Sequence, residues 1–204
     1  MGFMCSWIAV KGVSKDALLA SIGMVETDGR HEVFPAHRQV NFCVSERPNG
    51  WTVLFSEDID WASHERILEL SRLGPAVGLQ FEDKVEMESI ATGAENGVEL
   101  WRVYHSNDPK KPELDVRGTP PSEFAGIRDG LLKEREDDDG DGPSCDYLHD
   151  IPLETAKAAC GYRTDEVEEP FTALKPIGAD DGEAAYGRRR EPFFRSLFGL
   201  FKRK

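Results

Sequence analysis

The chain has 204 residues and a formal net charge of −13, from 25 Lys and Arg against 38 Asp and Glu. Its 39% hydrophobic and 31% charged residues fit a soluble globular protein with one good-sized core, and the acidic balance predicts no nucleic-acid partner. No apolar run approaches the roughly 18 residues of a membrane span, and the N-terminus lacks the basic region and apolar core of an export signal. The four cysteines include no Cys-x-x-Cys pair. We therefore expect a cytoplasmic protein with reduced thiols.

Alternating apolar positions, helix caps and turn residues predict short strands and helices along most of the chain. Connections of the hairpin kind outnumber crossovers, which favours an α+β fold with a largely antiparallel sheet and three or four helices. The expected elements are strands over 6–11, 30–34, 40–44, 51–55, 76–81, 85–91, 98–105 and 114–117, and helices over 14–23, 63–73, 120–133 and 151–160.

Two turn signals predict hairpins. Asn49-Gly50 separates two alternating apolar runs, and the Gly- and Asn-containing loop over 93–97 separates two more. The expected registers pair Phe42 with Phe55, Val44 with Val53, and Glu88 with Arg102.

The composition changes after this region, which predicts three parts. Residues 1–164 should form the globular α+β domain. Residues 165–187 are acidic and contain Pro170, Pro176 and several glycines, which is typical of a flexible linker. Residues 188–204 should form a basic amphipathic tail.

Three short segments resemble a family of small soluble bacterial proteins with no assigned activity. They are Trp7-Ile8-Ala9-Val10-Lys11-Gly12, Asn49-Gly50-Trp51 and Leu100-Trp101-Arg102-Val103. The resemblance covers residues 1–165 and implies a bacterial cytoplasmic protein. It transfers no catalytic residue, because the family has none assigned.

The tail is the segment with the strongest sequence argument for function. It holds seven basic residues and one acid, a charge of +6, so the rest of the chain carries −19. On a helical wheel its aromatic and leucine side chains gather on one side, with basic residues opposite, as in interfacial or groove-binding helices. An inert terminus is the alternative. The candidate interaction residues are Arg188, Arg189, Arg190, Phe193, Phe194, Arg195, Leu197, Phe198, Phe201, Lys202 and Arg203.

Acid–base chemistry has one candidate group. Glu86 and Glu88 share a face of one predicted strand, and His105 lies on the neighbouring strand. Paired carboxylates near a histidine can transfer protons when they are buried together. The alternative is a solvated sheet face, in which Lys84 and Arg102 neutralise the two glutamates.

Metal chemistry has weaker candidates. Asp137, Asp139 and Asp141 begin like an EF-hand loop, but Leu148 stands where the loop needs its closing glutamate, so a solvated acidic loop is the alternative. Cys145 and His149 are four residues apart, which matches no closed zinc site. We expect neither a metal nor a cofactor.

The sequence therefore predicts a non-enzymatic cytoplasmic binding or regulatory protein. Its body would recognise a protein partner, and its tail would dock on that partner or on the anionic inner surface of the membrane. An enzyme of unrecognised class with a carboxylate/His cleft and a weak divalent-cation-binding protein are the alternatives. The oligomeric state is left open.

Overall fold

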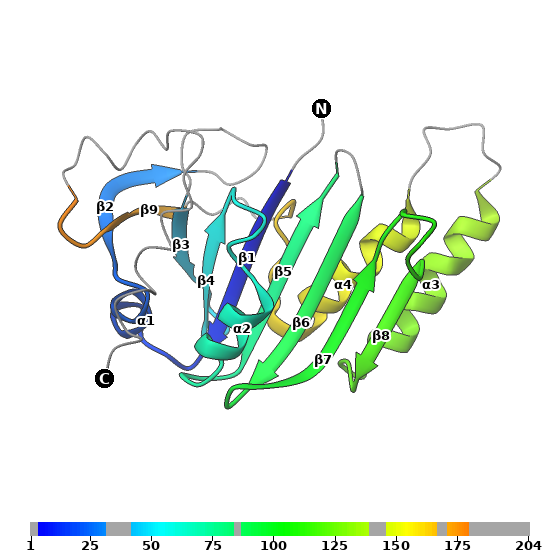
Figure 1. Cartoon of the computed structure of the whole chain (residues 1–204), viewed down its shortest axis with the longest axis horizontal. Coiled ribbons are helices and arrows are strands. Elements are labelled where there is room, and N and C mark those ends of the chain that lie inside the picture. Colours follow the sequence, from blue (N-terminus) through cyan, green and yellow to red (C-terminus); the bar gives the residue numbers. More distant parts are fainter. Residues whose placement is uncertain (1–3, 32–41, 84–86, 139–145, 167–170, 180–204) are drawn as a thin grey trace.

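The computed structural model describes residues 4–31, 42–83, 87–138, 146–166 and 171–179, with backbone alone described for Arg30 and His31. Along the chain, runs of strands are separated by single helices or by the pair α3 and α4 (Figure 1). They are β1 (Met4–Lys11), α1 (Lys15–Ser21), β2 (Met24–His31), β3 (Phe42–Glu46), β4 (Trp51–Ser56), α2 (His64–Leu70), β5 (Ala76–Glu82), β6 (Glu88–Glu95), β7 (Val98–His105), β8 (Leu114–Gly118), α3 (Phe124–Asp137), α4 (Tyr147–Cys160) and β9 (Phe171–Pro176).

The described strands form one sheet of nine, in the order β2-β9-β3-β4-β1-β5-β6-β7-β8. Every neighbouring pair is antiparallel. Together with four described helices, this sheet confirms the predicted α+β class. The strand β1 lies at the centre, paired with β4 on one side and β5 on the other.

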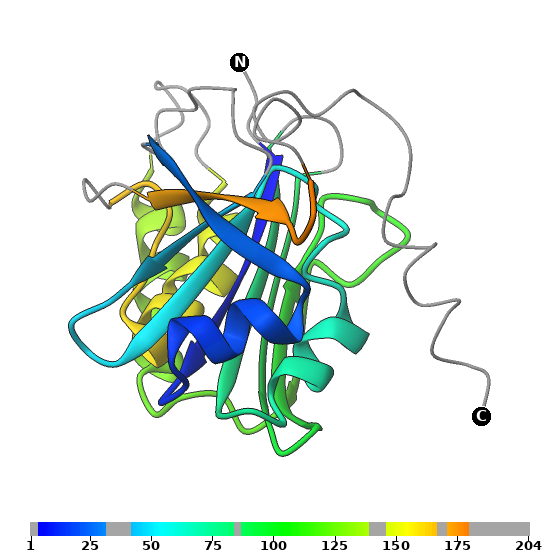
Figure 2. The ribbon, with the colours of Figure 1, turned by 90° about the vertical axis from the view of Figure 1, so that its left-hand side faces the viewer.

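Helices cover the two faces of the sheet unequally. Along β1, Trp7 and Ala9 enter the core beneath α4, whereas Ile8 and Val10 enter a second core beneath α1 and α2. Figure 2 shows α1 and α2 on one side of the sheet and α3 and α4 on the other. Successive side chains of a strand point to opposite faces, so a strand buried on both faces must be apolar throughout. This explains the unbroken apolar run that predicted β1.

The helix α4 begins earlier than the expected 151–160. Asp146 caps it through hydrogen bonds from the main-chain N–H groups of Leu148 and His149, at 3.2 and 3.3 Å. Pro152, which predicted a helix start, lies inside the helix instead. At the other end, the Asn49 side-chain amide donates a hydrogen bond to the carbonyl of Cys160 at 2.8 Å. The predicted Asn49-Gly50 turn therefore also anchors the end of α4.

Both predicted hairpins form, but their registers differ from the expected ones. Cys43 is opposite Phe55 and Val44 is opposite Leu54, so the first register is shifted by one residue. In the second hairpin Arg102 is opposite Thr92 rather than Glu88. The β6–β7 turn is shorter than the expected loop, because Asn96 and Gly97 both have positive φ, at 53° and 79°. Two successive residues of that kind close a tight hairpin.

Two segments near the ends of the sheet were predicted wrongly. The strand expected over 30–34 is β2, which begins at Met24. The expected linker contains β9, which is hydrogen-bonded to β2 and β3. Phe171 and Leu174 of β9 are buried, so this part of the segment belongs to the globular core. Among the described residues, no helix is long and apolar enough to cross a membrane.

Candidate functional site

Glu88, one of the three acid–base candidates, has its carboxylate engaged by three donors. Its Oε1 accepts hydrogen bonds from Tyr104 Oη at 2.8 Å and Ser106 Oγ at 3.1 Å, and it pairs with the ammonium of Lys111. Burial acts to raise the pKa of this carboxyl, but the hydrogen bonds from Lys111, Tyr104 and Ser106 outweigh it and bring the pKa below its usual range. Glu88 is therefore ionised and held in place.

His105, the second predicted residue, is fully buried and contacts two acceptors. Its Nδ1 lies 2.7 Å from the carbonyl oxygen of Glu113, and its Nε2 lies 3.1 Å from Oδ2 of Asp146. Both ring nitrogens therefore face oxygen atoms of the protein. The contact with Asp146 ties β7 to the start of α4.

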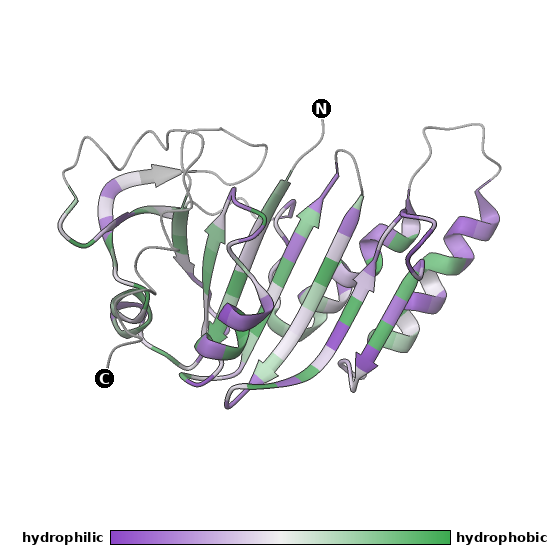
Figure 3. Ribbon diagram, in the orientation of Figure 1, coloured by the Kyte–Doolittle hydropathy of each residue, from purple (hydrophilic) through white to green (hydrophobic). Residues whose placement is uncertain are grey.

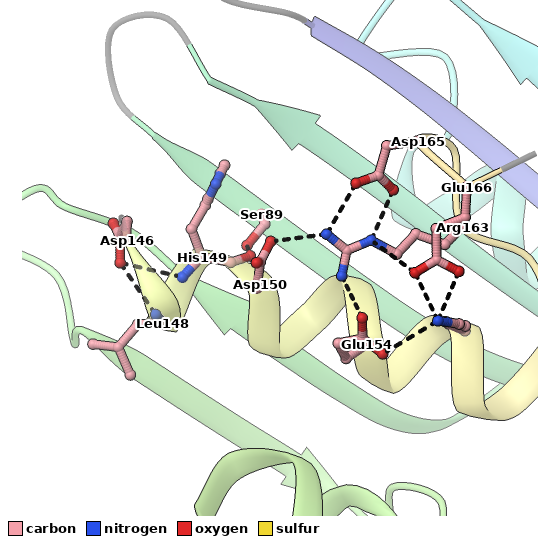
Figure 4. A network of polar contacts seen from close by, with 10 residues as sticks. Ser89, Asp146, Leu148, His149, Asp150, Glu154, Arg163, Asp165 and Glu166 are labelled. Carbon is pink, nitrogen blue, oxygen red and sulfur yellow. Dashed lines mark hydrogen bonds and ion pairs between the residues drawn. The ribbon is translucent and has the colours of Figure 1, made fainter. Parts of the chain in front are cut away.

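Asp146 combines helix capping with this contact. Burial acts to raise its pKa, but the hydrogen bond and charge of His105, with further hydrogen bonds from Asn107 and the His149 main chain, lower it to about 2. One carboxylate oxygen thus caps α4, and the other pairs with His105 (Figure 4 shows the capping contacts).

His149 is the other imidazole of this cluster. It is buried, its ring packs against Phe81 at 4.6 Å between centroids, and its Nε2 has no hydrogen-bond partner among the described residues. Burial lowers its pKa, and the nearby charge of His105 acts in the same direction. Its main-chain carbonyl accepts a hydrogen bond from Ser89 Oγ at 2.8 Å. This ring is therefore neutral and serves the packing between α4 and the sheet.

The structure does not bring Glu88 and His105 together. Tyr104, which contacts Glu88, and His105 are adjacent on β7, so their side chains point to opposite faces of the sheet. Glu86, the third candidate, lies outside the described residues. The described geometry therefore gives Glu88 and His105 no shared site.

The metal and tail candidates fall mostly outside the described residues. Asp137 is exposed at the end of α3, while Asp139, Asp141 and Cys145 are not described. Across the described part of the chain, no group of three His, Cys, Asp or Glu side chains is arranged to hold a metal ion. All the candidate residues of the tail over 188–204 lie beyond the last described residue.

A second charged cluster surrounds Arg163, after the end of α4 (Figure 4). Its guanidinium binds Asp165 at 2.7 Å and Asp150 at 3.3 Å, and it also pairs with Glu154. The Arg163 side chain is 13% exposed, so these carboxylates satisfy a mostly buried cation. The cluster fastens the segment after α4 onto the helix, and we assign it a structural role.

One face of the sheet remains uncovered. The helix α2 reaches β6, but none of the described helices lies over β7 and β8 on that side (Figure 1). A Cβ on Gly78 would meet Ile67 of α2, so Gly78 points to this side. Residues paired across adjacent strands share a face. We call this surface the open face and define it by Ile90, Thr92, Arg102, Tyr104, Asp115 and Arg117.

Hydrophilic and hydrophobic residues alternate along β7 and β8, as expected for strands covered on one side (Figure 3). At the centre of the open face, Arg102 lies directly opposite Arg117. Asp115 neutralises Arg117 through a contact of 2.9 Å. Arg102 is partly buried, and within the described residues its Nε is buried without a hydrogen-bond partner.

Arg102 is therefore a cation that could bind an anion. An unpaired polar group at a partly buried position costs free energy, and like charges directly opposite each other add to that cost. A carboxylate or phosphate oxygen would satisfy the guanidinium and separate it electrostatically from Arg117. From the sequence, Arg102 was expected to neutralise Glu88. In the structure, Arg102 lies opposite Thr92 and Lys111 pairs with Glu88 instead.

Sequence reasoning missed two features of these sites. Asp146 preceding a run of helix-forming residues was a detectable cap signal, but Pro152 drew the predicted start of the helix to residue 151. The isolation of Arg102 had no sequence signal, because it follows from strand order and register.

Comparison with known proteins adds no relative: no protein-family model matches the chain, and searches of curated proteins and solved structures found no match.

Proposed function

We propose that this chain is a non-enzymatic cytoplasmic binding protein whose open face recognises an acidic segment of a protein partner. The observation that carries the proposal is Arg102, a partly buried guanidinium without an anion among the described residues of a chain that carries −13 overall. In a chain with such an excess of carboxylates, an arginine left unpaired is available to an external one. The aromatic ring of Tyr104 and the apolar Ile90 lie in the next row of the same face.

The enzyme alternative has less support. Glu88 is held by Lys111, Tyr104 and Ser106, and His105 has both nitrogens occupied. A general acid must bring a proton, and a general base a lone pair, within reach of a substrate. In the structure, His105 is fully buried and both its nitrogens contact protein oxygens, and Glu88 is bound by three protein donors.

The test uses a hexaglutamate peptide as the probe and two-dimensional NMR of the labelled full chain. Binding should shift the amide signals of the open face. Arg102→Gln should weaken binding at least about tenfold, because a charged hydrogen bond is lost. Arg128→Gln is the matched control, since Arg128 lies on α3, behind the sheet, and is paired with Asp129 at 2.8 Å. Shifts elsewhere, or equal binding by the two variants, would refute the proposal. If inorganic phosphate binds as tightly as the hexaglutamate peptide, the site binds any anion and does not recognise an acidic segment.

The tail forms the second part of the proposal, supported by its +6 charge and aromatic stripe. Basic residues near an anionic leaflet contribute about 1 kcal/mol each, enough for peripheral binding. Co-sedimentation with vesicles of phosphatidylglycerol and phosphatidylcholine should retain the full chain but not one ending at Gly187. Vesicles of phosphatidylcholine alone are the control. If both chains sediment equally with the vesicles, the tail does not bind the membrane. A groove on a protein partner would then be its proposed target.

A further inference from the structure

The strand β8 lies at one end of the sheet. It pairs with β7, and no other described strand pairs with its outer edge. The N–H of Thr119 donates to the carbonyl of Leu100 at 3.0 Å, which sets the alternation of hydrogen bonds along this pair. The main-chain groups of Arg117 and Asp115 consequently face β7, whereas those of Val116 and Leu114 face outward. An unpaired edge of this kind can add a further strand.

The sequence of β8 is complementary to itself. In an antiparallel pair of two β8 strands centred on Val116, Asp115 of each copy lies opposite Arg117 of the other. These two ion pairs fall on the open-face side of the sheet. The two Val116 residues face each other at the centre, where their outward N–H and C=O groups form a hydrogen-bonded pair. Charge and backbone geometry therefore select the same register.

The exposure of these side chains fits such a contact. Val116 is 37% exposed, and the side chain of Arg117 is 63% exposed. In the single chain, Arg117 pairs with Asp115 of its own strand, so the contact would exchange one carboxylate for an equivalent one.

The partly exposed helix next to β8 is consistent with a contact at this edge. The helix α3 stands beside β8 at this end of the molecule (Figure 1), and none of its 14 residues is buried. Phe124 and Leu131 are only partly covered. A two-fold axis through Val116 would bring the α3 helices of two copies towards each other behind the joined sheet.

On the opposite edge of the sheet, the register centred on Thr27 lacks this complementarity. The strand β2 pairs only with β9 among the described strands. A register centred on its Thr27 would place Glu26 opposite Asp28 of the second copy. Like charges directly opposite each other disfavour pairing.

We propose that the chain forms a homodimer in which the β8 strands of two copies pair in antiparallel fashion about Val116. Such a contact is isologous, since the same residues meet from both sides, and it closes at two copies. It would join two nine-stranded sheets into one continuous sheet. The open faces of both copies would then lie on one surface, although the dimer does not depend on the function proposed above.

Sedimentation velocity of the full chain tests this directly, with a dimer at twice the 22.8 kDa of one chain. Asp115→Arg places like charges opposite each other at two points and should weaken the dimer at least about tenfold. The double variant Asp115→Arg/Arg117→Asp restores opposite charges and should restore the dimer. Val116→Pro removes an outward N–H and should abolish it, while thermal unfolding checks that each variant is folded.

Lys15→Glu is the matched control, because it breaks an ion pair of 2.9 Å with Glu26 at the other end of the sheet. It should leave the dimer unchanged. A wild-type chain that sediments only as a monomer would overturn the proposal. So would a dimer that survives both Asp115→Arg and Val116→Pro, or a double variant that stays monomeric although folded.

Discussion

At the scale of single residues, the ion pair between His105 and Asp146 makes stability depend on one carboxylate. The pKa of Asp146 is lowered to about 2 in the folded chain. Its contribution is therefore complete above its unfolded value near pH 3.9 and is lost as the pH falls towards 2. Asp146→Asn would take the carboxylate away from the fully buried His105 ring. We expect this variant to be less stable by about 3 kcal/mol at pH 7, as measured by urea unfolding.

The pH dependence separates this electrostatic effect from simple loss of the helix cap. As the pH approaches 2, the wild-type carboxyl takes up its proton and the stability difference from Asp146→Asn should shrink. Asp129→Asn, at an exposed pair on α3, should change stability by less than about 0.5 kcal/mol. A difference that stays constant across this range would contradict the assigned charge.

His149 gives a pH dependence at higher values. Its folded pKa is lowered below 6.5, so below that pH the unfolded chain takes up a proton that the folded chain does not. Acidification below pH 6.5 therefore destabilises the fold, with a slope of at most about 1.4 kcal/mol per pH unit from this group. His149→Phe, which keeps a ring against Phe81, should flatten the unfolding free energy below pH 6.5. An unchanged slope in urea titrations would rule out this assignment.

At the scale of elements, β6 and β7 pack through a glycine. A Cβ on Gly93 would lie 2.1 Å from Nε1 of Trp101, so the indole rests on the bare backbone. Trp101 is 6% exposed and cannot move without opening the core. Gly93→Ala should therefore destabilise the chain by about 1–3 kcal/mol in thermal or urea unfolding.

The matched control for Gly93 is a glycine with free space around it. Gly130 lies inside α3 with no atom within 4 Å of the position of a Cβ. Alanine there should stabilise the chain by about 0.5–1 kcal/mol, because it removes a flexible residue from a helix interior. Equal effects from the two alanines would mean that Trp101 does not depend on Gly93.

Local patterns predicted most elements but not how they join. The bounds of β7 match the expected 98–105, since alternation and a tight turn define it locally. The register of the first hairpin was missed because one extra residue in the turn after Glu46 shifts every pair, and that of the second because its turn is shorter than expected. β9 was missed because its prolines and acidic surroundings resemble a linker. Burial of Phe171 nevertheless makes the segment part of the core. The open face could not be predicted at all, because it depends on which strands receive a helix.

At the scale of the whole molecule, the surfaces covered by helices differ from the uncovered ones in how their charged groups are paired. Helices enclose the two sides around β1, while β7 and β8 leave one side and one edge uncovered. On the covered side, the charged groups Asp146 and Arg163 have partners of opposite charge or matching hydrogen bonds. The unpaired cation Arg102 and the self-complementary β8 lie on the uncovered side. The proposed contacts therefore concentrate where the architecture leaves groups unsatisfied.

The position of β9 allows a test of where the globular unit ends. β9 bridges β2 to β3, so a chain that ends at Glu166 leaves β2 without its partner strand and exposes the other side of the core. Phe171 and Leu174 are 0% and 3% exposed, and burial of each contributes about 1.5–3 kcal/mol. A chain ending at Glu166 should thus be less stable by several kcal/mol than one ending at Gly187, which keeps β9. Urea unfolding of the two chains measures this difference, and equal midpoints and slopes would return residues 171–176 to the role of a linker.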